Sequence, residues 1–211
     1  MALEGMPHSG KTTSITAIDK LKERGIILLN EIYFAKEHLK SLEDKKGTIV
    51  ESKWFIDQEV KRRAEIIKND LNSCKLILAD RTYLSTLAYC YARSKLNKKP
   101  KEYEELKKYV NRKRIDFLEY DSMIVFDNDV VTTLNRRDDL GKEDVAYWNN
   151  QEFMVHFQNF YIGEINKFCQ SKIIRLNVKD IGINDVISGI LKYLNEEGIV
   201  LRDNVEVNKT T

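Results

Sequence analysis

The chain has 211 residues, which is long enough for one α/β domain with a full hydrophobic core. Its 35 basic and 33 acidic residues leave a net charge of +2, which argues against a nucleic-acid polymer or a membrane as partner. Apolar runs are too short to span a bilayer, no signal peptide is recognised, and the 3 scattered cysteines lack metal-binding spacing, so we expect a cytoplasmic protein.

Apolar runs alternate with helical patterns along the chain. We expect strands over residues 1–4, 26–30, 75–80, 123–127 and 172–177. Helical patterns cover residues 12–24, 35–44, 49–72, 83–93, 101–115, 130–137, 149–169 and 184–195, with a basic loop over 95–101 and no assignment for 200–211. This alternation predicts an α/β fold, with a parallel sheet covered by helices on both faces, in a single domain over residues 1–211.

The longest predicted helix, residues 49–72, carries two different faces. At 100° per residue one arc is apolar, and we expect it to pack on the sheet: Ile49, Ile56, Val60, Ala64, Ile67 and Leu71. A second arc combines two aromatic rings, an amide and a cation: Trp54, Phe55, Gln58 and Arg62. The second arc is either a binding surface or a second packing face.

The opening of the chain carries the most specific motif. Residues 5–12 match G-x-x-x-x-G-K-[ST], the phosphate-binding loop, and the alternative is a glycine-rich turn with a surface lysine. Glycines let the backbone N–H groups approach phosphate oxygens, and the following helix presents its positive end to the same anion. We therefore expect ATP to bind at Gly5, Met6, Pro7, His8, Ser9, Gly10, Lys11, Thr12 and Thr13. Lys11 would reach the β- and γ-phosphates, and the Thr12 hydroxyl would ligate Mg²⁺.

Charged residues follow the predicted strands where each strand ends. Glu31, Asp80, Arg81 and Asp127 all fall at carboxyl ends, and ligands bind at these ends in parallel sheets. We expect these residues to meet the phosphate loop in one crevice. A carboxylate there suits a metal ion, and a guanidinium can grip phosphate oxygens; the alternative for Asp80 and Arg81 is a local ion pair at a helix start.

The segment Asp80-Arg81-Thr82-Tyr83-Leu84-Ser85-Thr86-Leu87-Ala88-Tyr89 resembles the thymidylate kinase signature D-R-[YH]-x-x-S-[ST]-x-A-[YF]-Q, departing at Thr82 and Cys90. Together with the phosphate loop, it resembles the thymidylate kinase and deoxynucleoside kinase superfamily over residues 1–194. The resemblance implies a P-loop NTPase fold, a three-layer α/β/α sandwich with a five-stranded parallel sheet of order 2-3-1-4-5 and a small lid near 136–148. It also implies that Asp80 holds Mg²⁺ through water and that Arg81 contacts the acceptor's phosphate or the transferring phosphoryl group.

The same resemblance implies roles for residues outside these motifs. Arg136 and Arg137 would be lid arginines that neutralise γ-phosphate charge or stack on adenine, and the alternative is a solvated helix end. The arc of Trp54, Phe55, Gln58 and Arg62 would form the acceptor pocket, in which the Arg62 cation contacts the acceptor's phosphate. Tyr89 would lie beside the sugar, although it could equally be a half-buried aromatic residue.

Features of both superfamily branches occur in the chain. Pro7 and Cys90 replace an aspartate and a glutamine of thymidylate kinases, whereas Glu31 resembles the general base of deoxynucleoside kinases but is followed by Ile32, not proline. We expect a kinase that uses ATP and Mg²⁺ to phosphorylate a nucleoside monophosphate. The alternatives are a nucleoside kinase with Glu31 as base, a kinase of another small hydroxylated molecule, and a non-enzymatic nucleotide-binding switch. The expected partner is a nucleotide or nucleoside, and a homodimer is left open.

Overall fold

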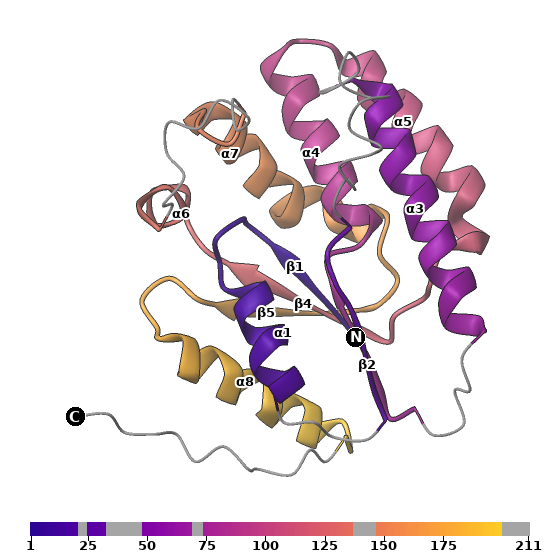
Figure 1. The fold of residues 1–211 in the computed structure, drawn as a ribbon. Helices are drawn as coiled ribbons and strands as arrows, with labels where there is room; N and C mark the ends of the chain where they lie inside the picture. The colour runs from indigo at the N-terminus through magenta and orange to yellow at the C-terminus, as the bar shows by residue number, and fades with distance from the viewer. Residues whose placement is uncertain (21–24, 33–47, 69–73, 137–146, 200–211) are drawn as a thin grey trace.

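A computed structural model shows the fold and describes residues 1–20, 25–32, 48–68, 74–136 and 147–199 (Figure 1). Its five strands form one sheet of order β2-β3-β1-β4-β5, and all neighbouring strands are parallel. The strands are β1 (Ala2–Gly5), β2 (Ile26–Leu29), β3 (Leu76–Asp80), β4 (Ser122–Asp127) and β5 (Lys172–Asn177). The predicted fold class and strand order are confirmed.

Helices cover both faces of the sheet, so the molecule has three layers (Figure 1). The helices are α1 (Lys11–Lys20), α3 (Ile49–Ile67), α4 (Tyr83–Leu96), α5 (Pro100–Lys113), α6 (Val130–Asn135), α7 (Gln151–Asn159) and α8 (Ile183–Glu196). α1 and α8 lie together on one face, and α3, α4, α5 and α7 lie on the other. None of the described helices combines the length and the apolar composition needed to cross a bilayer.

The central strand β1 feeds two separate hydrophobic cores. Ala2 faces the core beneath α4, α5 and α7, and Leu3 faces the core beneath α1 and α8. Successive side chains of a strand point to opposite faces of a sheet, and every residue of β1 is buried. This burial fixes the position of the loop that leaves β1 at Gly5.

The buried face of α3 differs from the predicted one. Ile67 is 58% exposed and Ala64 is also exposed, whereas the buried residues are Ser52, Ile56, Glu59, Arg62 and Ile66. The prediction that Ala64 and Ile67 pack on the sheet is therefore wrong, and Leu71 of the same arc lies outside the described residues. Arg62 lies on the buried face and not on a separate arc. The physical reason is that Glu59 and Arg62 are buried as an ion pair, which a count of apolar residues does not detect.

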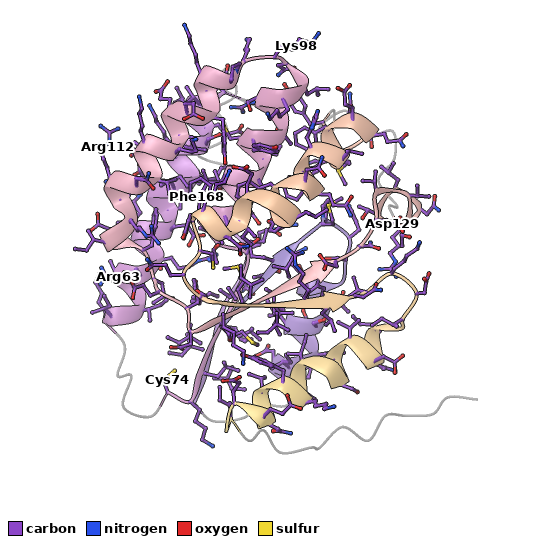
Figure 2. The ribbon with its side chains drawn as sticks, turned by 180° about the vertical axis from the view of Figure 1, so that it is seen from behind. Arg63, Cys74, Lys98, Arg112, Asp129 and Phe168 are labelled. Carbon is purple, nitrogen blue, oxygen red and sulfur yellow. The ribbon has the colours of Figure 1, made fainter. Side chains whose placement is uncertain are left out.

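Other element boundaries differ in smaller ways. The helix expected over 149–169 ends at Asn159 and continues as a π-helical turn (Phe160–Glu164) and a 3₁₀ turn (Ile165–Lys167); another 3₁₀ turn (Arg114–Asp116) follows α5. The helix expected over 35–44 lies outside the described residues. In Figure 2, Lys98 marks the turn between α4 and α5, Asp129 lies just beyond the carboxyl end of β4, and Cys74 lies near the opposite edge of the sheet.

Candidate active site

The phosphate loop lies between β1 and α1, which is the strand–loop–helix arrangement that its motif requires. Gly5 has a φ of 117° and Gly10 a φ of 94°, conformations that residues with a side chain rarely adopt. A Cβ atom at Gly5 would lie 2.5 Å from the carbonyl oxygen of Phe126 in β4. The first glycine is thus required both by its backbone conformation and by its close approach to the neighbouring strand.

Lys11, the motif lysine, is folded against the loop. Its side chain is buried, and Nζ donates to the carbonyl oxygens of Gly5 (3.2 Å) and Met6 and to Ser9 Oγ (3.0 Å). Burial, together with the nearby Arg81 cation, lowers the pKa of Lys11 to about 7. A bound phosphate group would reverse this effect, because an anion next to the ammonium stabilises its charged form.

Thr12 and Asp80 form the candidate metal site. Thr12 Oγ1 donates to Asp80 Oδ2 at 2.6 Å, so the start of α1 meets the carboxyl end of β3. Asp80 is buried, and its Oδ1 atom has no hydrogen-bond partner in the described part of the chain. Within the same ranges, no three His, Cys, Asp or Glu side chains cluster in a way that could hold a metal ion. One carboxylate and one hydroxyl fit Mg²⁺, which keeps several waters and binds substrate phosphates.

Arg81 joins three parts of the predicted crevice. Its Nε atom pairs with Glu31 Oε1 at 2.8 Å, and Nη1 donates to the Gly5 carbonyl (3.3 Å) and to Ser85 Oγ (3.1 Å). Burial, the largest single effect, opposes its charge, but the neighbouring groups together, Glu31 first and then Tyr161, Glu4 and Asp80, outweigh burial and raise the pKa of Arg81. The ends of β2 and β3 and the phosphate loop therefore meet as the sequence predicts.

Glu4 is a site residue that the sequence analysis missed. This fully buried carboxylate accepts hydrogen bonds from Thr82 N (2.7 Å), Thr82 Oγ1 (2.7 Å), Ser85 Oγ (2.6 Å) and Tyr161 OH (2.8 Å). It connects the base of the phosphate loop to the start of α4 and to the segment after α7. A charged residue inside an otherwise apolar central strand was the signal that could have revealed it.

Arg62 has partners other than those expected for an acceptor ligand. Nη1 donates to the Arg81 carbonyl (3.0 Å) and Nη2 to the Asn30 carbonyl (2.5 Å), while Glu59 Oε1 lies 3.3 Å from Nη1. Glu59 is a second residue that the sequence analysis missed. Burial raises the pKa of Glu59 to about 7, despite the nearby Arg62 cation.

The other predicted acceptor residues lie on α3 and α4. Trp54 and Phe55 are half-buried and form an edge-to-face pair with centroids 5.1 Å apart, and Gln58 Nε2 donates to the Trp54 carbonyl at 3.5 Å. Tyr89 lies in an aromatic cluster, with ring centroids 5.9 Å from Tyr147, 5.5 Å from Trp148 and 5.3 Å from Phe153. Their acceptor-binding roles remain predictions.

The structure describes only part of the predicted lid. Arg136 Nη2 donates to the carbonyls of Val178 (2.9 Å) and Lys179 (2.7 Å), which ties the end of α6 to the segment after β5. Arg137 and the rest of the lid up to residue 146 lie outside the described residues. Asp127 pairs with Arg175 of β5 at 2.9 Å.

Comparisons with known proteins agree with this geometry. A family model described as an AAA domain matches residues 1–156, and no curated protein matches the sequence. M. mycoides deoxyadenosine kinase with bound dATP has a TM-score of 0.66 at 19% identity, covering 92% of this chain and 98% of that one. The same enzyme with the products dCMP and a flexible dCDP has a TM-score of 0.70 at 16% identity, with the same coverage. Candida albicans thymidylate kinase has a TM-score of 0.70 at 17% identity, covering 93% of this chain and 91% of that one. The expected fold resemblance to both kinases is confirmed.

Proposed function

The chain belongs to the AAA domain family and folds like P-loop nucleoside and nucleotide kinases, and from this premise we propose that it transfers the γ-phosphoryl group of ATP to a hydroxyl group of a deoxynucleoside. The observation that carries the proposal is the Glu31–Arg81 pair, 2.8 Å apart, beside the phosphate loop. A hydroxyl acceptor must lose a proton during transfer, so a carboxylate at this place supports such an acceptor. An anionic monophosphate would instead be matched by cations.

Each site residue has a chemical role in this proposal. The acceptor oxygen forms a bond to the γ-phosphorus while the bond from that phosphorus to the bridging oxygen of ADP breaks, and the hydroxyl proton passes to Glu31. Lys11 and Arg81 neutralise the charge on the phosphoryl oxygens, and the loop N–H groups orient the β- and γ-phosphates. Thr12 and Asp80 would hold Mg²⁺, which when bound neutralises phosphate charge.

Phosphorylation of a nucleoside monophosphate is the second candidate. The resemblance of the segment that begins at Asp80 to the thymidylate kinase signature favours it. That interpretation assigned the acceptor's phosphate to Arg62 beside Arg81, but both terminal nitrogens of Arg62 donate to main-chain carbonyls in the structure, and Arg81 pairs with Glu31. We therefore place the nucleoside first.

An ADP-release assay over a panel of deoxynucleosides and their monophosphates tests the proposal. Glu31→Gln keeps the shape of the side chain and removes its basicity, so we expect kcat on a deoxynucleoside to fall about 10²–10⁴-fold. The affinity for an ATP analogue should stay within about twofold, because Glu31 does not belong to the phosphate loop. The control, Glu119→Gln, changes an exposed carboxylate beyond the amino end of β4 and should behave as wild type. Transfer to monophosphates alone, with normal Glu31→Gln turnover, would overturn the proposal.

A further inference from the structure

Arg62 lies between the ends of the two strands that carry the proposed reacting groups. The last backbone pair between β2 and β3 is Leu29 with Ala79, so no sheet pairing joins these two strands at the next residues, although Asp80 still pairs with Leu3 of β1. There the Arg62 guanidinium takes over: Nη2 donates to the Asn30 carbonyl at 2.5 Å and Nη1 to the Arg81 carbonyl at 3.0 Å. One side chain of α3 thus ties the two strand ends together.

The Glu31–Arg81 ion pair closes this connection into a ring. Asn30 precedes Glu31 in the chain, and the Glu31 carboxylate pairs with Arg81 Nε at 2.8 Å. The ring therefore runs from Arg62 through Asn30 and Glu31 to the Arg81 side chain, and returns through the Arg81 carbonyl to Arg62. Groups joined in such a ring depend on one another, and loss of one member is expected to weaken the others.

The backbone of Arg81 requires this support. Its φ of 61° lies in the left-handed region, which costs a non-glycine residue about 1–3 kcal/mol and persists only where its surroundings hold it. Arg81 N donates to the Leu3 carbonyl at 3.0 Å, and its carbonyl accepts from Arg62. Both sides of the strained residue are thereby fixed, and its side chain is directed toward Glu31 and the loop.

Arg62 is itself held from the other side. Glu59, one turn earlier on α3, places Oε1 at 3.3 Å from Nη1, and both side chains are about 9% exposed. The planar guanidinium can donate to two carbonyls and a carboxylate at once, whereas a lysine ammonium lacks this fork geometry. These fixed hydrogen bonds compensate only part of the desolvation of the pair, which agrees with the raised pKa of Glu59.

We propose that Arg62 is a positioning residue that sets the Glu31 carboxylate against Arg81 without contacting either substrate. This inference rests on the proposed function, in which Glu31 accepts the acceptor's proton. It differs from the role expected for Arg62 from the sequence, a direct contact with an acceptor's phosphate. Loss of a positioning residue lowers kcat, whereas loss of a ground-state acceptor contact raises KM.

A double-mutant cycle with Glu31→Gln and Arg62→Gln tests the inference. We expect Arg62→Gln to lower kcat at least about tenfold while KM for acceptor and for ATP stays within about twofold. In the Glu31→Gln background the same change should lower kcat by less than about threefold, because the carboxylate to be positioned is already lost. The matched control is Arg63→Gln, which changes the neighbouring, half-buried arginine (Figure 2) and should retain wild-type kcat.

The urea unfolding midpoints of the same variants are then measured, because unfolding does not depend on catalysis. We expect the midpoint shifts of the two single variants to be non-additive, because both break the same ring. If the wild type phosphorylates no acceptor, the proposed function fails, and the unfolding cycle still tests the ring. Additive midpoint shifts, or a raised acceptor KM with normal kcat, would overturn the positioning role. If Arg62→Gln does not fold, Arg62→Lys replaces it in the kinetic cycle and in the unfolding cycle. Lysine retains the positive charge but lacks the fork geometry of the guanidinium, so the expected outcomes are the same.

Discussion

Replacement of Gly5 by alanine tests how the phosphate loop is built into the sheet. The new Cβ would lie 2.5 Å from the carbonyl oxygen and 3.0 Å from the nitrogen of Phe126, both rigid backbone atoms of β4. Overpacking of this kind costs about 1–3 kcal/mol, and the φ of 117° adds a strain of about 1–3 kcal/mol. We therefore expect Gly5→Ala to lower the free energy of unfolding by about 2–6 kcal/mol, a large part of a typical domain's stability.

Urea unfolding followed by circular dichroism measures this loss, and Gly163→Ala is the matched control. Gly163 lies in the π-helical turn, and a Cβ there would meet nothing within 4 Å. Alanine also has the higher helix propensity, so the control should be as stable as wild type or up to about 1 kcal/mol more stable. If Gly5→Ala lost less than about 1 kcal/mol, the close packing of the loop against β4 would not constrain the fold as described.

Two further predictions follow from shifted pKa values. The pKa of Lys11 is about 7 in the free protein, and bound phosphate would raise it, so nucleotide affinity should fall as pH rises between about 7 and 9. Calorimetry of nucleotide binding near pH 8, in buffers of different ionisation enthalpy, should show proton uptake. Lys11→Ala should abolish both this uptake and phosphoryl transfer while the fold is retained. The pKa of Glu59 is raised from 4.5 to about 7 in the folded state, so the folded protein holds this proton more tightly than the unfolded chain. The resulting contribution to the free energy of unfolding is largest below pH 4.5 and is lost as pH rises through 7. Glu59→Gln should remove this dependence, which amounts to about 3 kcal/mol at most, and Glu119→Gln should retain it.

Each of these predictions has its own contradicting result. Nucleotide binding without proton uptake would mean that Lys11 is already charged in the free protein. An unchanged pH dependence of unfolding in Glu59→Gln would mean that another group titrates in the window between pH 4.5 and about 7. Normal transfer by a folded Lys11→Ala variant would remove the phosphate-loop assignment.

The parts of the site that depend on local geometry could be predicted from the sequence. The spacing of Gly5, Gly10 and Lys11 specifies a loop between a strand and a helix, and the structure has β1 and α1 there. Parallel strands also bring their carboxyl ends to one edge, which is why Glu31 and Arg81 could be expected to meet. Neither inference required knowledge of side-chain partners.

Buried charged groups could not be predicted in the same way. Glu4 is satisfied by Tyr161, 157 residues further along the chain, and Arg62 by main-chain carbonyls at the ends of two strands. Helical periodicity reports which residues share a face, but it does not distinguish a polar face that binds a ligand from one paired within the protein. Periodicity alone therefore leaves a binding surface and a second packing face as alternatives for the arc that contains Arg62.

The most direct test of the account is a competition between two acceptors in one reaction. The wild-type protein is given γ-labelled ATP with Mg²⁺ and equal amounts of a deoxynucleoside and its 5′-monophosphate, for each base in turn, and the labelled products are separated. With at least one base we expect the label to enter the nucleoside hydroxyl and yield a labelled monophosphate, and Glu31→Gln to suppress this product. Label found only in diphosphates, and equally in Glu31→Gln, would contradict the assignment of Glu31 as the base for a hydroxyl acceptor.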